Sequence, residues 1–115
     1  MTEVSQNQVF VGIDVSKASL DVALNDKDAS QRFANDDQGI RALLTLLKPL
    51  NVAVVLMEAT GGLERSVAEA LYLEGFAVMV VNPRQAHDFG KAMGYLAKTD
   101  NIDARMLSHF ACTLH

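Results

Sequence analysis

The sequence predicts an α/β fold, a mixed five-stranded sheet with helices on both faces. Three short runs of β-branched and apolar residues come first, and helical and strand-like segments then alternate. Two later runs, Val52–Met57 and Phe76–Val81, are continuously apolar, as expected of buried strands covered on both sides. Because the chain has 115 residues, half of them hydrophobic, we expect residues 1–115 to form a single domain.

The first three strands are predicted to form an antiparallel meander. Val9–Val15 and Leu20–Leu24 are separated by a short polar segment that suits a tight connection, and Gln31–Ala34 follows as a third strand. Residues 1–8 are mostly polar and are expected to be a flexible tail. Three of the five strands are therefore expected within the first 34 residues.

Helices are predicted where apolar residues recur at helical spacing between cap and stop signals. The four expected helices lie between Asn35–Asp37 and Pro49, from about Leu63 to Glu74, from Pro83 to about Leu96, and over Asp100–Leu114. The last two strands, each reached through a helix, should lie parallel to the first by right-handed crossovers. This layout resembles that of ribonuclease H-like nucleases, although a fold alone does not establish a function.

Composition argues against several classes of protein. No apolar stretch approaches the roughly 20 residues that span a bilayer, and the start lacks a secretory signal, so we expect a cytoplasmic protein that does not bind membranes. The net charge of −4 argues against binding nucleic acid by charge alone. Acids that hold metal ions nevertheless present positive charge once the ions are bound.

Cys112 is expected to be a buried free thiol, and His87 and His109 lack the spacing of zinc ligands.

Two acids interrupt or end apolar runs. Asp14 lies inside an apolar run, where a buried carboxylate costs several kcal/mol unless a partner compensates it. Alternation places Phe10, Gly12 and Asp14 on one face, and we expect the glycine to leave room for a ligand. Glu58 follows Val52–Met57 in the same way. If the two strands are neighbours, both carboxylates emerge at the carboxyl edge of the sheet, where ligands commonly bind.

A second acidic pair precedes the apolar part of the last helix. Asp100 and Asp103 are three residues apart, so their side chains should share one helical face, although such a pair alone is more often a capping feature. Four converging carboxylates would repel one another, whereas Mg²⁺ or Mn²⁺ takes oxygen ligands. Two such ions about 3.5–4 Å apart support phosphoryl transfer. The four acids are therefore the candidate catalytic and metal-binding residues.

Weaker signals mark possible contacts with phosphate. Lys17, in the turn after Asp14, and Lys98 and Arg105, beside the second acidic pair, are candidate nucleic-acid contacts. Their alternatives are a polar turn and exposed helical charges. Thr60-Gly61 precedes a helix whose free amides could hold a phosphate, and the alternative of a cap and tight turn is slightly favoured.

Four short motifs occur in register along the chain. They are Gly12–Lys17 with Leu20–Val22, Glu58–Gly61, Val81–Pro83 and Lys98–Arg105. Each is weak alone. In this order and spacing they resemble the amino-terminal domain of the IS110/IS1111 family of transposases, which also includes the Piv DNA invertases, and the resemblance covers nearly the whole chain.

The resemblance implies a RuvC-like domain whose acidic tetrad holds Mg²⁺ or Mn²⁺ and serves DNA strand cleavage and transfer in insertion-sequence transposition. The tetrad falls on Asp14, Glu58, Asp100 and Asp103. The implied partners are DNA, a guide RNA encoded by the element, and further copies of the protein, in the cytoplasm of a bacterium or archaeon. Family members also have a carboxy-terminal domain with a nucleophilic serine. This sequence stops at His115, so we expect that domain to be absent and the isolated fragment to be inactive.

Two other functions remain open from the sequence. Gly12–Lys17 also resembles the first phosphate loop of actin-like sugar kinases and ATPases, which need a second comparable domain to enclose ATP. Nucleotide binding would favour that function. The other possibility is a non-catalytic module that docks nucleic acid or self-associates, which would be indifferent to Mg²⁺.

Overall fold

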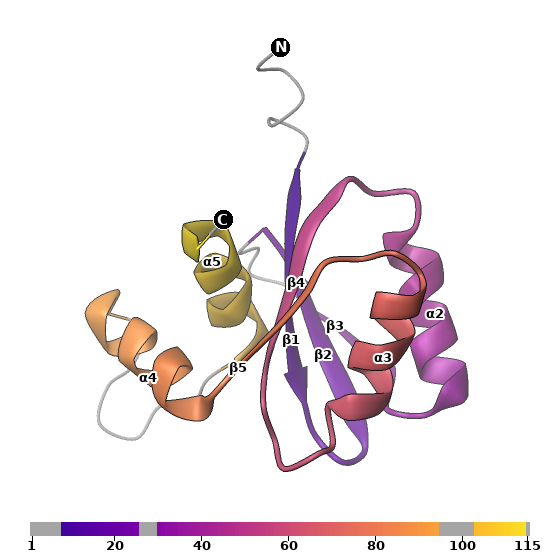
Figure 1. The fold of residues 1–115 in the computed structure, drawn as a ribbon, viewed down its shortest axis with the longest axis horizontal. Coiled ribbons are helices and arrows are strands. Elements are labelled where there is room, and N and C mark those ends of the chain that lie inside the picture. Colours follow the sequence, from indigo (N-terminus) through magenta and orange to yellow (C-terminus); the bar gives the residue numbers. More distant parts are fainter. Residues whose placement is uncertain (1–7, 26–29, 95–102, 115) are drawn as a thin grey trace.

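A computed structural model of the chain describes residues 8–25, 30–94 and 103–114, and its centre is a five-stranded sheet. The strands are β1 (Val9–Val15), β2 (Ser19–Leu24), β3 (Gln31–Ala34), β4 (Val52–Glu58) and β5 (Val78–Val81). The helices are α2 (Asp37–Leu47), α3 (Arg65–Leu73), α4 (Pro83–Ala92) and α5 (Ala104–Leu114). Helices α2 and α3 lie on one side of the sheet, and α4 and α5 lie on the other (Figure 1). The predicted mixed α/β fold is confirmed.

The strand order is β3-β2-β1-β4-β5. The first three strands pair antiparallel, as the predicted meander requires, while β4 runs parallel to β1 and β5 runs parallel to β4. Both crossovers contain a helix. The carboxyl ends of β1, β4 and β5 therefore meet at one edge of the sheet.

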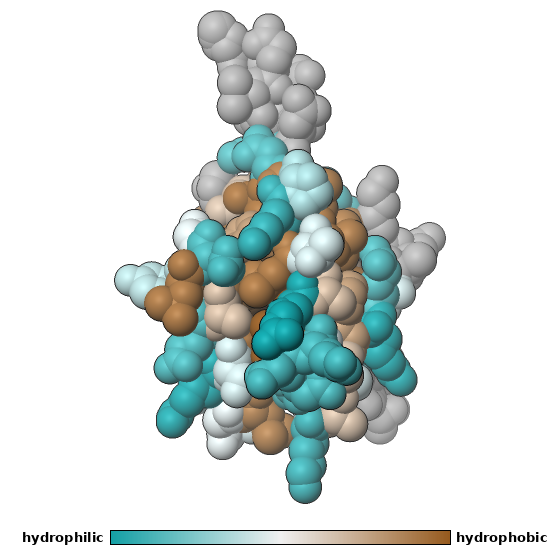
Figure 2. Space-filling view, turned by 90° about the vertical axis from the view of Figure 1, so that its right-hand side faces the viewer, coloured by the Kyte–Doolittle hydropathy of each residue, from teal (hydrophilic) through white to brown (hydrophobic). Residues whose placement is uncertain are grey.

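The two faces of the sheet form separate hydrophobic cores. In β1, Val11, Ile13 and Val15 pack with α2 and α3, while Phe10 packs with the cluster under α4 and α5. The same alternation divides β4. The outward surface of α2 and α3 presents hydrophilic side chains around a smaller apolar area, as expected of amphipathic helices (Figure 2).

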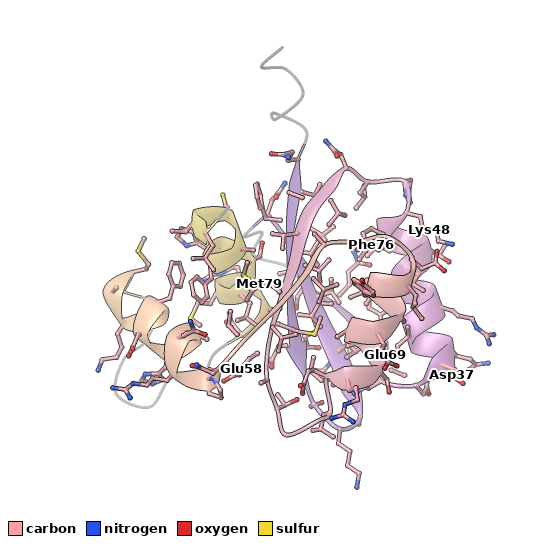
Figure 3. All side chains as sticks on the ribbon, in the orientation of Figure 1. Asp37, Lys48, Glu58, Glu69, Phe76 and Met79 are labelled. Carbon is pink, nitrogen blue, oxygen red and sulfur yellow. The ribbon has the colours of Figure 1, made fainter. Side chains whose placement is uncertain are left out.

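Strand β5 differs from the expected strand buried on both faces. It is the last strand of the sheet and begins at Val78 rather than Phe76. Met79 and Val80 are 38% and 44% exposed, and Figure 3 shows Met79 on this outer strand. A continuous apolar run predicts a strand, but it does not distinguish a central strand from an edge strand.

The helix boundaries refine the prediction. α3 begins at Arg65, because Gly61 and Gly62 adopt positive φ angles of 75° and 110° in the preceding turn. α4 begins as predicted, with Asn82 and Gln85 forming a capping box, and ends at Ala92. The expected continuation to Leu96 and the tail over residues 1–7 lie outside the described residues.

The last helix also corrects an expectation about its cysteine. Cys112 is exposed rather than buried. Helix α5 turns another face toward the sheet, including the buried side chains of Leu107 and Ala111. The apolar character of this segment therefore did not determine whether Cys112 lies on the buried or the exposed face of the helix.

No helix in the described part of the chain is both long and apolar enough to cross a membrane.

Candidate functional site

Asp14 and Glu58 lie at the same edge and on the same face of the sheet. Asp14 is the penultimate residue of β1, and Glu58 is the last residue of β4. The parallel register pairs Ile13 with Met57, so its continuation brings the two acids level. Because Leu56 packs in the core under α4 and α5, alternation places Glu58 on that face too. Figure 3 shows Glu58 at the end of β4, close to where α4 begins.

Asp103 is brought to this face by α5. Its Oδ1 accepts a hydrogen bond from the Met106 amide at 2.9 Å, and its carbonyl oxygen accepts one from the Leu107 amide at 3.1 Å. Asp103 thus caps the helix rather than standing inside its first turn, which bears out the capping alternative for this residue. Asp100 and Lys98 lie outside the described residues, so the expected shared helical face of Asp100 and Asp103 is not described.

Gly12 makes room for α5, not for the ligand that the sequence suggested. A Cβ atom at this position would overlap the backbone of Ala104 and Ser108. The Ser108 hydroxyl donates a hydrogen bond to the Phe10 carbonyl at 2.6 Å, which fixes the helix against β1. Since Asp103 immediately precedes α5, the missing side chain at Gly12 sets how closely Asp103 approaches the strand that carries Asp14.

The acids at this edge interact electrostatically. Burial, followed by repulsion from Asp21, Glu58 and Asp103, raises the pKa of Asp14 to about 6, while Arg32 acts in the opposite direction. Burial also raises the pKa of Glu58, with the charge of His87 opposing it. Three of the four predicted acids, Asp14, Glu58 and Asp103, therefore lie close enough for the negative charges of Glu58 and Asp103 to act on Asp14.

No group of three or more His, Cys, Asp or Glu side chains within residues 8–25, 30–94 and 103–114 is arranged to hold a metal ion. The described acids are close enough to change one another's ionisation, yet they do not surround a common point. Asp100, the remaining predicted ligand, is not among these residues.

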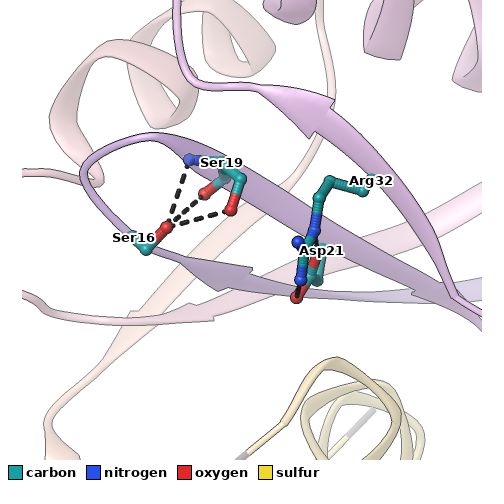
Figure 4. A network of polar contacts seen from close by, with 4 residues as sticks. All are labelled: Ser16, Ser19, Asp21 and Arg32. Atoms are coloured by element: carbon teal, nitrogen blue, oxygen red, sulfur yellow. Dashed lines mark hydrogen bonds and ion pairs between the residues drawn. The ribbon is translucent and has the colours of Figure 1, made fainter.

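Asp21 and Arg32 belong to this site and were missed as site residues from the sequence. The strand register places Asp21 opposite Asp14, and Arg32 opposite Asp21. Arg32 Nε donates to Asp21 Oδ1 at 2.7 Å and Nη2 donates to Oδ2 at 3.2 Å, which forms a two-pronged ion pair (Figure 4). The available sequence signal was an acid between the buried Leu20 and Val22, on the strand next to Asp14.

The candidate phosphate contacts fall in two places. Lys17 is exposed in the turn between β1 and β2, where Ser16 Oγ accepts a hydrogen bond from the Ser19 amide at 3.1 Å (Figure 4). This segment thus forms the polar turn that was the alternative to a phosphate contact at Lys17. Arg105 lines a hollow of about 300 Å³, together with Asp21, Ser30, Asp103 and Ala104.

The loop after β4 is held by a side chain of the protein. Glu64 Oε1 accepts hydrogen bonds from the Thr60 amide at 2.9 Å, the Thr60 hydroxyl at 2.8 Å and the Gly62 amide at 3.2 Å. The bond from the Thr60 amide is the main cause of a lowered pKa for Glu64. A carboxylate of the chain thus occupies these donors, as expected of the tight turn in the structural alternative, whereas the N-cap of α3 is Glu64 rather than Thr60 or Gly61.

The strand order, the helices on both faces and the acids at the carboxyl edge define a ribonuclease H-like α/β domain of the RuvC-like class. A family model for IS110-type transposases with a DEDD motif, described as a transposase, matches residues 11–115. The chain belongs to this transposase family, as its motifs predicted.

Two similar proteins are the pilin gene-inverting proteins of Moraxella lacunata and Moraxella bovis. Each is 26% identical to this chain over 110 residues. The match covers 90% of this chain and 34% of each relative, so the chain spans about a third of the length of these curated relatives.

Proposed function

We propose that this chain carries the metal-binding site for divalent-metal-dependent DNA strand cleavage and transfer in transposition. Its membership of a transposase family supports the general class of activity. The observation that carries the finer proposal is the position of Asp14 and Glu58 at one sheet edge with Asp103 near them, where burial, followed by repulsion from Asp21, Glu58 and Asp103, raises the pKa of Asp14 to about 6. A positive ion is the partner that such a set of carboxylates lacks.

The donor set suits Mg²⁺ or Mn²⁺. Asp14 and Glu58 offer half-buried carboxylate oxygens, and hard divalent cations bind oxygen ligands, often through one or two carboxylates each. We assign Asp14 and Glu58 as the central ligands, with Asp103 and Asp100 completing the set. When bound, the metal would activate the attacking oxygen and stabilise the leaving oxygen of a phosphodiester. The chain's own contribution is to fix the carboxylates on rigid strands and on a capped helix start.

The proposal takes DNA as the substrate. As in the family that the sequence resembles, it also takes an RNA encoded by the element and further copies of the protein as partners, acting in the cytoplasm of a bacterium or archaeon. A site that is so acidic before metal binding would repel phosphates. Metal binding should therefore precede productive binding of the scissile strand.

A calorimetric titration of Mn²⁺ tests the proposed metal site. We expect saturable binding by the wild-type chain and at least tenfold weaker binding by Asp14→Asn and Glu58→Gln, because each substitution removes a charged oxygen ligand. Asp37→Asn is the matched control, since Asp37 is exposed at the start of α2, on the other side of the sheet (Figure 3).

Two outcomes would contradict the proposed site. One is wild-type protein that binds no Mn²⁺ even with DNA present, which would favour a non-catalytic docking module. The other is Mn²⁺ binding that Asp14→Asn and Glu58→Gln change no more than Asp37→Asn does. Circular dichroism must first show that the wild-type protein, and in the second case each variant, is folded.

A further inference from the structure

A row of three charged residues crosses the sheet beside the proposed metal site. Asp14 on β1 faces Asp21 on β2, and Asp21 faces Arg32 on β3. Leu20 and Val22 belong to the core under α2 and α3, so alternation turns Asp21 toward the α5 face, where Asp14 lies. Figure 4 shows the Asp21–Arg32 pair on the side of the sheet where the α5 ribbon passes.

We propose that Arg32, held in place by Asp21, contacts a backbone phosphate of the nucleic acid bound at this edge, an inference that rests on the proposed function. The Arg32 guanidinium has five N–H donors, and its two-pronged bond to Asp21 uses Nε and one donor of Nη2. Three donors remain. The Arg32 side chain is 72% exposed, so these donors are accessible to a ligand from solvent.

Stability alone explains the pair poorly. Exposed ion pairs contribute little to the stability of a fold. Two acids placed directly opposite each other, as Asp14 and Asp21 are, destabilise a strand pair, and a sequence without Asp21 would avoid that repulsion. The arrangement makes sense if Asp21 serves to orient Arg32. A guanidinium fixed in one direction loses less conformational freedom when it binds a phosphate.

The charge distribution favours a phosphate as the ligand. Asp14, Asp21, Glu58 and Asp103 all contribute negative charge here, and Arg32 is the cation whose charge opposes theirs at Asp14. A metal ion would neutralise the acids that bind it, but the neighbouring phosphates of a strand need a cation of their own. Guanidinium groups bind phosphate oxygens in two-pronged geometry.

The surface beside the pair can accept a polymer backbone. Asp21 lines the hollow of about 300 Å³ together with Asp103, Ala104 and Arg105, at the start of α5. A strand lying in this hollow would pass between Asp21 and the helix start that carries Asp103. Arg32 would then meet a phosphate adjacent to the one at the acids, rather than the reacting phosphate itself.

Fluorescence anisotropy tests this contact. Binding of labelled DNA and of labelled RNA of the same sequence is measured in buffer that contains Ca²⁺, at several salt concentrations. We expect Arg32→Gln to weaken binding about tenfold and to reduce the slope of log K against log salt concentration by about one. Arg32→Lys should retain the slope, because it keeps the charge. The polymer that shows the loss is the one that Arg32 contacts.

Arg41→Gln is the matched control, because it removes the same charge from an exposed site on α2. The role of Asp21 is tested by repeating Arg32→Gln in an Asp21→Asn background, where the loss should shrink because the guanidinium is no longer oriented. An equal loss in both backgrounds would remove Asp21 from the inference. Thermal unfolding of each variant separates a structural effect from a lost contact.

The inference is overturned if Arg32→Gln binds both polymers as Arg41→Gln does. Should the wild-type chain bind Mn²⁺ and DNA in that case, the proposed metal site would stand without the phosphate contact. A wild-type chain that bound neither Mn²⁺ nor nucleic acid would overturn both. An unchanged salt slope with a lowered melting temperature would show that the pair is structural only.

Discussion

Gly12→Ala is expected to destabilise the domain by about 3 kcal/mol, at the upper end of overpacking substitutions. The added Cβ would overlap backbone atoms of Ala104 and Ser108, and these cannot rotate away as a flexible side chain would. Relief requires α5 to move off β1. That movement would break the hydrogen bond from Ser108 to the Phe10 carbonyl and expose the apolar contacts beneath the helix.

Urea unfolding measures this effect, with Gly61→Ala as the control. Nothing lies within 4 Å of a Cβ at Gly61, so that substitution should cost only about 1 kcal/mol, owing to its positive φ angle. The close packing of α5 on β1 would be contradicted if Gly12→Ala cost no more than Gly61→Ala.

Asp14→Asn is expected to stabilise the metal-free domain at pH 7 by about 1–2 kcal/mol. The pKa of Asp14 is about 6 in the folded chain, against an ordinary value of 3.8. A raised carboxyl pKa contributes stability that is fully present below the ordinary pKa and is lost as the pH rises through the folded value. A shift of this size corresponds to about 3 kcal/mol if taken in full, and the half-buried position of Asp14 reduces it.

The measurement is the difference in unfolding free energy between wild type and Asp14→Asn, followed from pH 4 to pH 7 in EDTA. Titrating groups that do not interact with Asp14, such as Glu64 with its lowered pKa, affect both proteins equally and cancel in this difference. What remains is the titration of Asp14 together with the acids coupled to it, Asp21, Glu58 and Asp103. The advantage of the variant should grow between pH 4 and pH 7. A difference that stays constant over this range would show that burial and the neighbouring acids do not raise the pKa of Asp14.

The sequence predicted the sheet and two of its acids for a simple physical reason. Continuous apolar runs in β1 and β4 mark strands that are buried on both faces, and an acid at the end of each run interrupts the pattern. Parallel strands bring such ends to one edge. The positions of Asp14 and Glu58 therefore followed from local pattern and topology together.

Other parts of the site depend on contacts that local pattern does not contain. Alternation placed Gly12 on the face of Asp14, but it did not show that α5 would cover that glycine. The pairing of Asp21 with Arg32 depends on the register between β2 and β3. A shift of that register by one residue would abolish the pairing. An apolar run did not distinguish the exposed edge strand β5 from a central strand.

Thermal unfolding with and without Mn²⁺ at pH 7 tests most directly whether the acids at the sheet edge are a metal site. Mn²⁺ should raise the melting temperature of the wild-type chain, since a ligand at about 100 times its Kd adds about 2.7 kcal/mol of stability. Asp14→Asn should melt higher than wild type without metal and gain little when Mn²⁺ is added. The assignment would be contradicted if Mn²⁺ raised the melting temperature of both proteins equally, or of neither.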